Sequence, residues 1–219
     1  MTGRSQSLTL KVSEIFHSLQ GEATRVGLPT VFVRLTGCPL RCLWCDTAHA
    51  FAGGHRLSLA AIMAQIAPYA TPHVCVTGGE PLAQKNCLPL LTALCDAGYD
   101  VSLETSGALD IAAVDPRVSR IVDFKAPSSG EVGKNYWPNV DLLVPRDEVK
   151  FVLADRADYD WARQTIEQYA LTERCPVLVS PVQGALDPRM LAEWVLADRL
   201  PVRFQMQLHK LLWGNMQGK

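Results

Sequence analysis

Residues 74–105 read VCVTGGEPLAQKNCLPLLTALCDAGYDVSLET, and this stretch decides the fold class. A valine-rich apolar run is followed by a glycine-rich loop, a helical pattern and a second apolar run. The helical pattern starts near Asn86 and ends before Gly98, and glycine is the usual residue just past a helix C-terminus. The order strand, helix, strand predicts a parallel pair of strands joined by a crossover helix.

The same alternation extends in both directions from this unit. Strand-like runs occupy residues 10–16, 30–35, 74–77, 101–105, 120–124, 148–153, 176–181 and 202–207. Helical patterns cover residues 59–66, a segment that starts at the candidate N-cap Asp158, and a segment that starts at Asp187 and Pro188. A closed eight-unit barrel needs about 250 residues. We therefore expect an α/β fold over residues 1–219: a single domain that forms a partial, open TIM-like barrel of about six βα units with parallel strands.

Composition narrows the class of function. The chain has 219 residues, 48% of them hydrophobic, and its 21 basic and 22 acidic residues leave a net charge of −1. This balance gives no electrostatic reason to expect nucleic acid or a membrane as a main partner. The first residues contain no long apolar run typical of a signal peptide, and no stretch approaches the roughly 20 apolar residues of a membrane helix. We expect a cytoplasmic protein.

Three of the seven cysteines lie within eight residues, at Cys38, Cys42 and Cys45. Thiolates suit iron–sulfur clusters and zinc, and a closed site normally has four ligands. The fourth ligand is missing locally, so an iron–sulfur cluster with one open iron is the main hypothesis. Structural zinc with a distant fourth ligand, Cys75 or His49, is the alternative. Outside the motif, Cys75, Cys87, Cys95 and Cys175 lie in apolar patterns typical of core residues.

The pattern C-x3-C-x2-C, with Trp44 before the last cysteine, resembles the signature of the radical S-adenosylmethionine superfamily. Residues 78–81, Gly-Gly-Glu-Pro, resemble that superfamily's second motif, which contacts the methionine amino group. This resemblance implies a 4Fe–4S cluster held by the three cysteines, with S-adenosylmethionine bound to the fourth iron.

Within the superfamily, the chain resembles the 7-carboxy-7-deazaguanine synthases over nearly its whole length. The resemblance rests on residues 14–38, 45–47, 76–81, 104–107, 123–131 and 204–214. It implies a carbon–nitrogen lyase of queuosine and deazapurine biosynthesis, which contracts the ring of 6-carboxy-5,6,7,8-tetrahydropterin with loss of ammonia. It also implies Mg²⁺, a homodimer and a reductant such as flavodoxin.

The resemblance carries over site residues position by position. The expected substrate contacts are Leu19, Gln20, Gly21, Arg34 and Thr77, of which Arg34 and Thr77 are also expected to act in catalysis. The expected cofactor contacts are Trp44, Cys45, Asp46, Gly79, Glu104, Ser106, Asp123, Phe124, Lys125, Ser180, Pro181, Val182 and Gln183. Thr47 is the expected Mg²⁺ ligand, and His209 and Lys210 support the assignment. Residues 211–219 extend past the end of short family members, so we expect no substrate contact from them.

Two other functions stay open from the sequence alone. An activase that installs a glycyl radical on a partner protein would share the cysteine motif and the size. A non-enzymatic electron carrier or zinc-binding module would use the cysteines without S-adenosylmethionine. Binding of S-adenosylmethionine and turnover of the free pterin would separate these possibilities.

Overall fold

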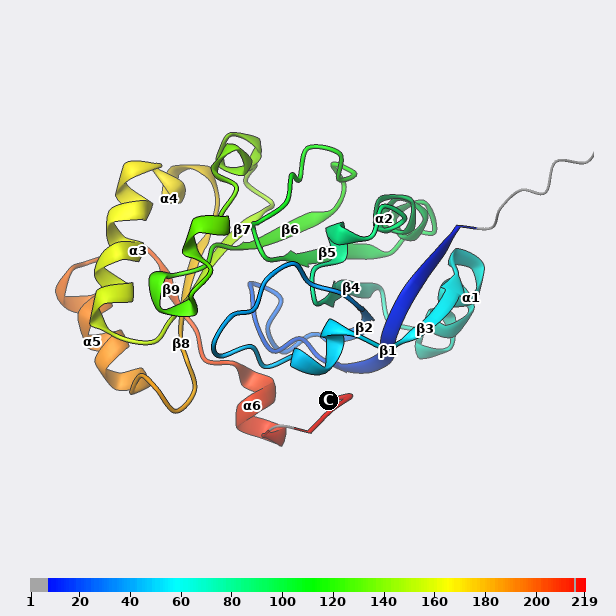
Figure 1. Ribbon diagram of the computed structural model, residues 1–219, viewed down its shortest axis with the longest axis horizontal. Helices are drawn as coiled ribbons and strands as arrows, with labels where there is room; N and C mark the ends of the chain where they lie inside the picture. The colour runs from blue at the N-terminus through cyan, green and yellow to red at the C-terminus, as the bar shows by residue number, and fades with distance from the viewer. Residues whose placement is uncertain (1–7, 215) are drawn as a thin grey trace, which may run out of the picture.

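One twisted sheet organises the chain in the computed structural model, which describes residues 8–214 and 216–219 (Figure 1). Within those residues the nine strands have the order β3-β1-β2-β4-β5-β6-β7-β8-β9. The strands are β1 (Thr9–Leu19), β2 (Pro29–Leu35), β3 (His55–Ser58), β4 (His73–Gly78), β5 (Asp100–Thr105), β6 (Ser119–Asp123), β7 (Glu148–Leu153), β8 (Val177–Pro181) and β9 (Arg203–Phe204). From β2 to β9 all neighbours are parallel, whereas β1 is antiparallel to β2 and β3. This arrangement confirms the open, mainly parallel fold.

Helices cover the outer face of the sheet. The α-helices are α1 (Leu59–Ile66), α2 (Cys87–Asp96), α3 (Arg156–Gln168), α4 (Leu171–Arg174), α5 (Pro188–Ala197) and α6 (Leu208–Trp213). Short 3-10 helices are η1 (Ala48–Phe51), η2 (Ala67–Tyr69), η3 (Pro81–Ala83), η4 (Pro127–Ser129), η5 (Val132–Lys134) and η6 (Trp137–Leu142). In Figure 1, α1 and α2 flank one end of the sheet and α3 to α5 the other, while α6 lies apart from both groups.

The helix starts follow local capping chemistry. Ser58 caps α1 by accepting from Ala61 N, and Asp187 caps α5 by accepting from Arg189 N. The predicted start of α3 at Asp158 is wrong, because Asp155 is the N-cap and accepts from Asp158 N. Asp158 is instead buried in the first turn, where its carboxylate accepts from Ser128 N and Ala154 N. Asp155 and Asp158 are both suitable N-cap residues, and the sequence pattern alone favoured Asp158.

Several local features differ from the sequence expectation. The strand β3 and the helix α6 were not predicted, and β9 covers only Arg203–Phe204 of the predicted residues 202–207. No α-helix forms in residues 106–118 or 124–147 between the flanking strands. Residues 106–118 contain one glycine and one proline, and residues 124–147 contain two glycines and three prolines, which favour turns over a continuous helix.

Side chains alternate between the two faces of each parallel strand. On β7, Val149, Phe151 and Leu153 belong to the buried core beneath the helices, whereas Lys150 and Val152 line a cavity on the inner face. The outer layer contains an aromatic stack in which Trp137 lies 4.9 Å from Phe124 and 4.8 Å from Tyr169, centroid to centroid. The apolar core therefore lies outside the barrel wall, and the barrel interior is left for polar groups.

A short segment after β1 crosses the open side of the barrel. The main chain of Ala23 pairs with the side-chain amide of Gln205, donating at 2.7 Å and accepting at 2.8 Å. Thr24 donates to the Glu148 carboxylate of β7 through its N–H at 2.8 Å and its hydroxyl at 2.6 Å. Residues 20–24, which we call the cross-barrel segment, therefore connect the first strand to the last third of the chain.

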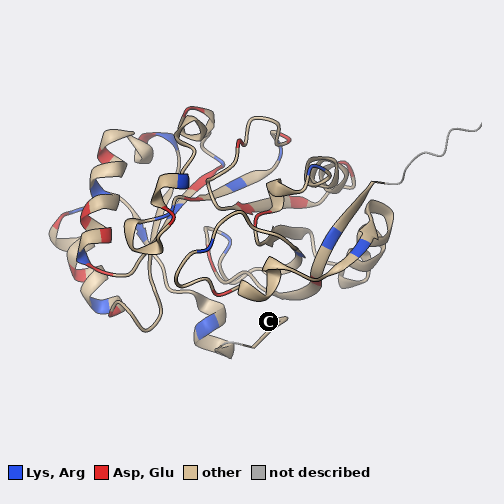
Figure 2. Cartoon of the chain, viewed as in Figure 1, with Lys and Arg blue, Asp and Glu red and all other residues tan. Residues whose placement is uncertain are grey.

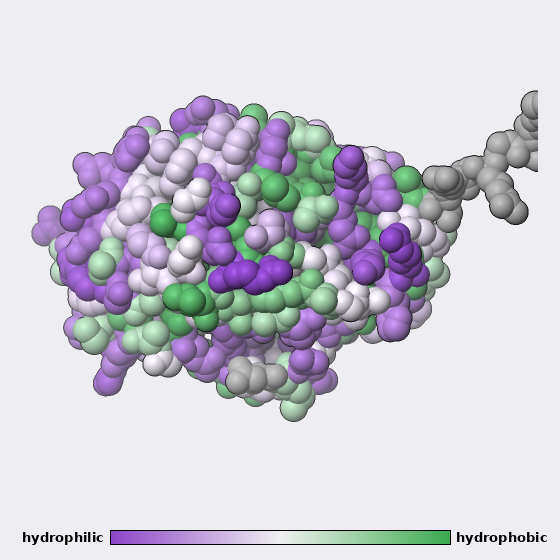
Figure 3. Space-filling model, in the orientation of Figure 1, coloured by the Kyte–Doolittle hydropathy of each residue, from purple (hydrophilic) through white to green (hydrophobic). Residues whose placement is uncertain are grey.

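Acidic and basic residues are mixed on the side of the molecule that Figure 2 shows. Figure 2 shows acidic and basic residues interspersed over α3 and α5. In Figure 3 the same side is mostly hydrophilic, and hydrophobic residues gather nearer the middle of the face. None of the helices in the described residues combines the length and apolar character needed to cross a membrane.

Candidate active site

A cavity of about 540 Å³ opens at the carboxyl ends of the parallel strands. Of the predicted site residues, the following line it: Leu19, Gln20, Gly21, Arg34, Cys38, Cys42, Trp44, Cys45, Asp46, Thr47, Thr77, Gly79, Glu104, Ser106, Asp123, Lys125, Val182, Gln183, His209 and Lys210. Residues that are up to 191 positions apart in the sequence therefore share one cavity, as expected for loops at the same edge of a parallel sheet.

The cysteine-bearing loop is fixed by hydrogen bonds to two neighbouring loops. Gly37 accepts from Glu80 N at 2.7 Å, which ties the start of the loop to the glycine-rich motif. Arg41 N donates to Glu131 Oε1 at 2.6 Å, and Leu43 N donates to Ser129 O at 3.1 Å. Leu40 anchors the middle of the loop, with a side chain only 2% exposed. The loop is thus held at both ends while its three thiols face the cavity.

The three thiols fit a cluster better than a single ion. Burial raises the pKa of Cys38 and Cys42, although Lys125 acts in the opposite direction by favouring their thiolates. No three metal-binding side chains among residues 8–214 and 216–219 converge on one ion. Cys75 is fully buried in β4, and His49 lies 3.6 Å from Glu14, so neither supports the zinc alternative. Three thiols on one cavity wall, without a fourth, match a cluster with one open iron.

Glycine is required next to the cysteine loop. A Cβ on Gly79 would lie 2.2 Å from Gly37 O and 3.0 Å from the Cβ of Cys38. A Cβ on Gly78, whose φ is +139°, would lie 2.1 Å from Leu35 O. The glycine pair therefore lets the loop after β4 approach the cysteine loop more closely than any other residue could.

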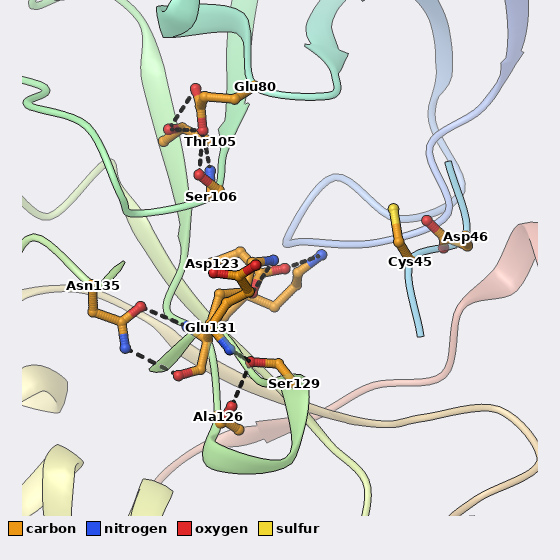
Figure 4. Close-up of polar contacts among 12 residues, drawn as sticks. Cys45, Asp46, Glu80, Thr105, Ser106, Asp123, Ala126, Ser129, Glu131 and Asn135 are labelled. Atoms are coloured by element: carbon orange, nitrogen blue, oxygen red, sulfur yellow. Dashed lines mark hydrogen bonds and ion pairs between the residues drawn. The ribbon is translucent and has the colours of Figure 1, made fainter. Parts of the chain in front are cut away.

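Glu80 connects this loop to the end of β5, and Figure 4 shows its side chain bonded to Thr105 and Ser106. Its carboxylate is fully buried and accepts from Thr105 Oγ1 at 3.0 Å, from Ser106 N at 2.6 Å and from Leu82 N at 2.9 Å. The Ser106 hydroxyl donates to the same group. A buried carboxylate with this many donors is fully satisfied, so Glu80 acts by holding two loops in place.

The N-terminal and C-terminal motifs pack directly on each other. Leu208 N donates to Gly21 O at 2.9 Å, and a Cβ on Gly21 would lie 2.1 Å from Nδ1 of His209. Lys210 forms an ion pair of 3.0 Å with Asp46. Of residues 211–219, from which no substrate contact was expected, Lys219 lines the cavity. Gly214, with a φ of +61°, ends α6.

Arg34 is oriented by its neighbours on β1. Its Nε donates to Glu14 Oε1 at 2.7 Å, and its guanidinium carbon lies 5.6 Å from the centroid of the Phe16 ring. Because Nε is engaged on the strand side, the two terminal nitrogens remain for a ligand in the cavity that Arg34 lines.

Thr77, Gln20 and Glu104 form one hydrogen-bonded group. Thr77 Oγ1 donates to Glu104 Oε2 at 2.7 Å, and Gln20 Nε2 donates to Glu104 Oε1 at 3.3 Å. Glu104 was expected beside the cofactor ribose. Its contacts in the structure are to two residues expected to bind substrate.

Opposite charges alternate across the floor of the cavity. Lys125 pairs with Asp123 at 3.0 Å, and Asp123 lies 3.2 Å from Lys150, which also pairs with Glu22. Burial raises the pKa of Glu22, but the Lys150 ammonium and hydrogen bonds outweigh burial and lower it overall. Burial lowers the pKa of Lys150, but its two carboxylate partners raise it well above the usual value. Both groups are therefore charged at neutral pH.

Asp46 carries a second charge pair at the rim of the cavity. Burial raises the pKa of Asp46, but attraction to Lys210 outweighs burial and brings it to about 2. Figure 4 shows Cys45 and Asp46 on one side of the site and Asp123 on the other. The space between them is therefore bordered by carboxylates from two different loops.

Three residues of the predicted cofactor set do not line the cavity. The side chains of Phe124, Ser180 and Pro181 are buried, and Phe124 packs in the outer aromatic stack. Strand alternation explains Phe124, because Asp123 and Lys125 on either side face inward. Sequence reasoning in turn missed Glu22 and Lys150. A charged residue between the apolar residues Val149 and Phe151, at an inward strand position, was the available signal for Lys150.

Comparison with known proteins places the chain among defined relatives. The Radical SAM superfamily model matches residues 32–170. A 7-carboxy-7-deazaguanine synthase of Chlorobaculum tepidum is 47% identical over 213 residues, covering 96% of this chain and 97% of that protein. The synthase of Koribacter versatilis is 42% identical over 219 residues, covering 93% and 97%.

A solved structure shows the same fold. The crystal structure of QueE from Escherichia coli superposes with a TM-score of 0.72 at 24% identity, covering 92% of this chain and 95% of that one. Fold, full-length similarity and the residues gathered in the cavity agree. The chain belongs to the radical SAM superfamily and, within it, to the 7-carboxy-7-deazaguanine synthase family.

Proposed function

We propose that this protein is a carbon–nitrogen lyase that converts 6-carboxy-5,6,7,8-tetrahydropterin into 7-carboxy-7-deazaguanine with loss of ammonia, a step towards queuosine and related deazapurines. One observation carries the proposal: the cysteine loop, the Gly79 loop, Arg34 and the packed pair of Gly21 and His209 border a single cavity. The relatives that match over the whole chain bear the name of this synthase, and none of those reported above is an activase or an electron carrier.

The residues divide into a cofactor side and a substrate side. Cys38, Cys42 and Cys45 would hold the cluster, and Gly79, Ser106 and Asp123 would contact S-adenosylmethionine. When bound, the cluster and S-adenosylmethionine supply one-electron cleavage and a radical that removes hydrogen from C6 of the substrate.

On the substrate side, Arg34 would bind the 6-carboxylate through its two terminal nitrogens. Glu22 and Glu104 present carboxylate oxygens to the cavity, and these are acceptors suited to the amino and ring N–H groups of a pterin. We therefore assign Glu104 to the substrate side, with Thr77 and Gln20 orienting it. Fixing the ring at both ends would leave C6 facing the cofactor side.

Anaerobic turnover tests the proposal directly. The protein, reconstituted with iron and sulfide, is incubated with S-adenosylmethionine, the pterin and a reductant, and the deazaguanine, ammonia and 5′-deoxyadenosine are quantified. Formation of 7-carboxy-7-deazaguanine is expected. A preparation with an intact cluster that cleaves S-adenosylmethionine without making this product would rule the function out.

Other features of the family are proposed with the same function. Thr47 would ligate Mg²⁺ through its hydroxyl, a hard oxygen donor of the kind that Mg²⁺ prefers. Addition of Mg²⁺ would then stimulate the unmodified protein but not Thr47→Val. A homodimer is checked by light scattering, and a flavodoxin as reductant by turnover with the reduced flavoprotein alone. The cytoplasmic location is part of the same proposal.

A further inference from the structure

Lys150 lines the cavity, but none of the ligand contacts proposed above involves it. It lies on β7, and its side chain is 11% exposed and points to the inner face of the sheet. Its ammonium pairs with Glu22 of the cross-barrel segment and with Asp123 at the end of β6. The two carboxylates belong to segments 101 residues apart, so Lys150 bridges groups that the local sequence does not hold together.

The two partners of Lys150 face different parts of the cavity. Glu22 is held at Oε2 by Lys150 and at Oε1 by Gln207, which fixes the plane of its carboxylate. Asp123 is held at Oδ1 by Lys125 and at Oδ2 by Lys150. Both carboxylates line the cavity, Glu22 beside the substrate residues and Asp123 beside the cysteine loop.

No other cation contacts Glu22 in the part of the chain that the structure describes. The cavity is bordered by the side-chain carboxylates of Glu22, Asp46, Glu104 and Asp123 and by the cationic side chains of Arg34, Lys125, Lys150, Lys210 and Lys219. Removing one charge from a buried pair leaves its partner uncompensated, which costs far more than the net contribution of the intact pair. Glu22 and Asp123 would then repel each other or move apart.

We propose that Lys150 is a positioning residue that sets the distance between the substrate-binding carboxylate Glu22 and the cofactor-facing carboxylate Asp123. The inference rests on the proposed function, because it assigns Glu22 to the amino and N–H edge of the pterin. Lys150 thereby fixes how far the substrate lies from the radical source, and it determines how often hydrogen removal from the pterin follows cleavage of S-adenosylmethionine.

The test compares Lys150→Met, Lys150→Arg and the exposed control Lys134→Met. Calorimetry with S-adenosylmethionine present and no reductant measures pterin binding without turnover. Lys150→Met is expected to raise the Kd for the pterin at least about tenfold, and Lys150→Arg, which keeps the charge, to recover most of this loss. Lys134→Met should behave as the unmodified protein does.

A second readout is the amount of 5′-deoxyadenosine formed per deazaguanine. Lys150→Met is expected to raise this ratio several-fold, since cleavage of S-adenosylmethionine continues while the pterin is misplaced. Thr24→Val is the control within the cross-barrel segment, because it removes only the hydrogen bond from the Thr24 hydroxyl to Glu148. It should leave the ratio of 5′-deoxyadenosine to deazaguanine unchanged. An unchanged Kd and ratio in Lys150→Met would overturn the inference, as would a Lys150→Arg variant no better than methionine.

The outcomes separate this inference from the proposed function. If the unmodified protein makes no deazaguanine, the function is wrong whatever the variants do. If it turns over the pterin but Lys150→Met binds and couples normally, only the role of Lys150 is wrong. Should Lys150→Met fail to fold, as judged by circular dichroism, the comparison of Lys150→Arg with Lys150→Gln carries the same decision.

Discussion

Replacing Glu80 by glutamine removes one charge from the support beneath the active-site loops and keeps the shape of the side chain. In the native protein Oε1 accepts from Leu82 N and Oε2 accepts from Ser106 N, while Thr105 Oγ1 contacts both oxygens. Glutamine has a single acceptor oxygen and an NH2 donor. Whichever oxygen is replaced, one buried backbone N–H loses its acceptor and faces another donor.

The magnitude follows from these contacts. A hydrogen bond to a charged group contributes about 1.5–3 kcal/mol, and a buried donor left without a partner costs about 1–3 kcal/mol. Glu80→Gln weakens the remaining bonds and leaves one N–H unpaired, so we expect a loss of about 3 kcal/mol in the free energy of unfolding. Thr105→Val is the matched control: it removes one hydroxyl donor and leaves the carboxylate with three donors, so it should cost about 1 kcal/mol.

Guanidinium-induced unfolding of the cluster-free protein under anaerobic conditions measures both values through tryptophan fluorescence. The shift of the midpoint at constant slope gives the difference in the free energy of unfolding. A Glu80→Gln protein within about 0.5 kcal/mol of the unmodified one would show that the carboxylate is dispensable. A larger loss in Thr105→Val than in Glu80→Gln would equally refute the reasoning.

Three further predictions concern the cavity itself. Gly79→Ala should lower the iron content after reconstitution, because its Cβ would lie 2.2 Å from Gly37 O. The control Gly133→Ala, whose Cβ would have nothing within 4 Å, should bind iron normally. Equal iron contents in the two variants would contradict the packing argument. Cys42→Ala should lose the visible absorption of the cluster and keep the fold by circular dichroism, and a retained 4Fe–4S spectrum would exclude Cys42 as a ligand. Arg34→Lys should raise the Kd for the pterin at least about tenfold, because a bidentate contact is lost. A pterin without the 6-carboxylate should bind both proteins equally, and a preference for the arginine form would refute this role.

Most of the fold could be predicted from local sequence patterns. The parallel core was predictable because apolar runs and helical periods alternate regularly, and the predicted helix starts near Asn86 and at Asp187 agree with α2 and α5. β3 was not predictable, because residues 55–58 are mostly polar and exist as a strand only through pairing with β1. Asp155 caps α3, whereas the Asp158 carboxylate accepts from the main chain of Ser128, 30 residues away, and of Ala154.

Some residues of the candidate site could be predicted from sequence motifs, and others could not. Motif residues such as Cys38 and Gly79 could be selected from the sequence because their spacing carries chemical information. Phe124 was included with its neighbours, although strand alternation directs its side chain to the core. The charge of Lys150 at an inward strand position was a usable signal, but its pairing with Glu22 joins positions 128 residues apart and has no local signature. Only the cross-barrel segment, which crosses the open side of the barrel, brings Glu22 next to Lys150.

The cross-barrel segment also constrains when the active site can form. Gln205 binds both main-chain groups of Ala23 across a separation of 182 residues, and Leu208 binds Gly21 beside it. Contacts of such long range form late, since the entropy of closing a large loop must be offset by structure already in place. During synthesis, the strands up to β7 can assemble while residues 20–24 still have no partner at the C-terminal end. The substrate side of the cavity is therefore completed only when the last helix of the chain has emerged, whereas the cysteine loop has all its supports much earlier.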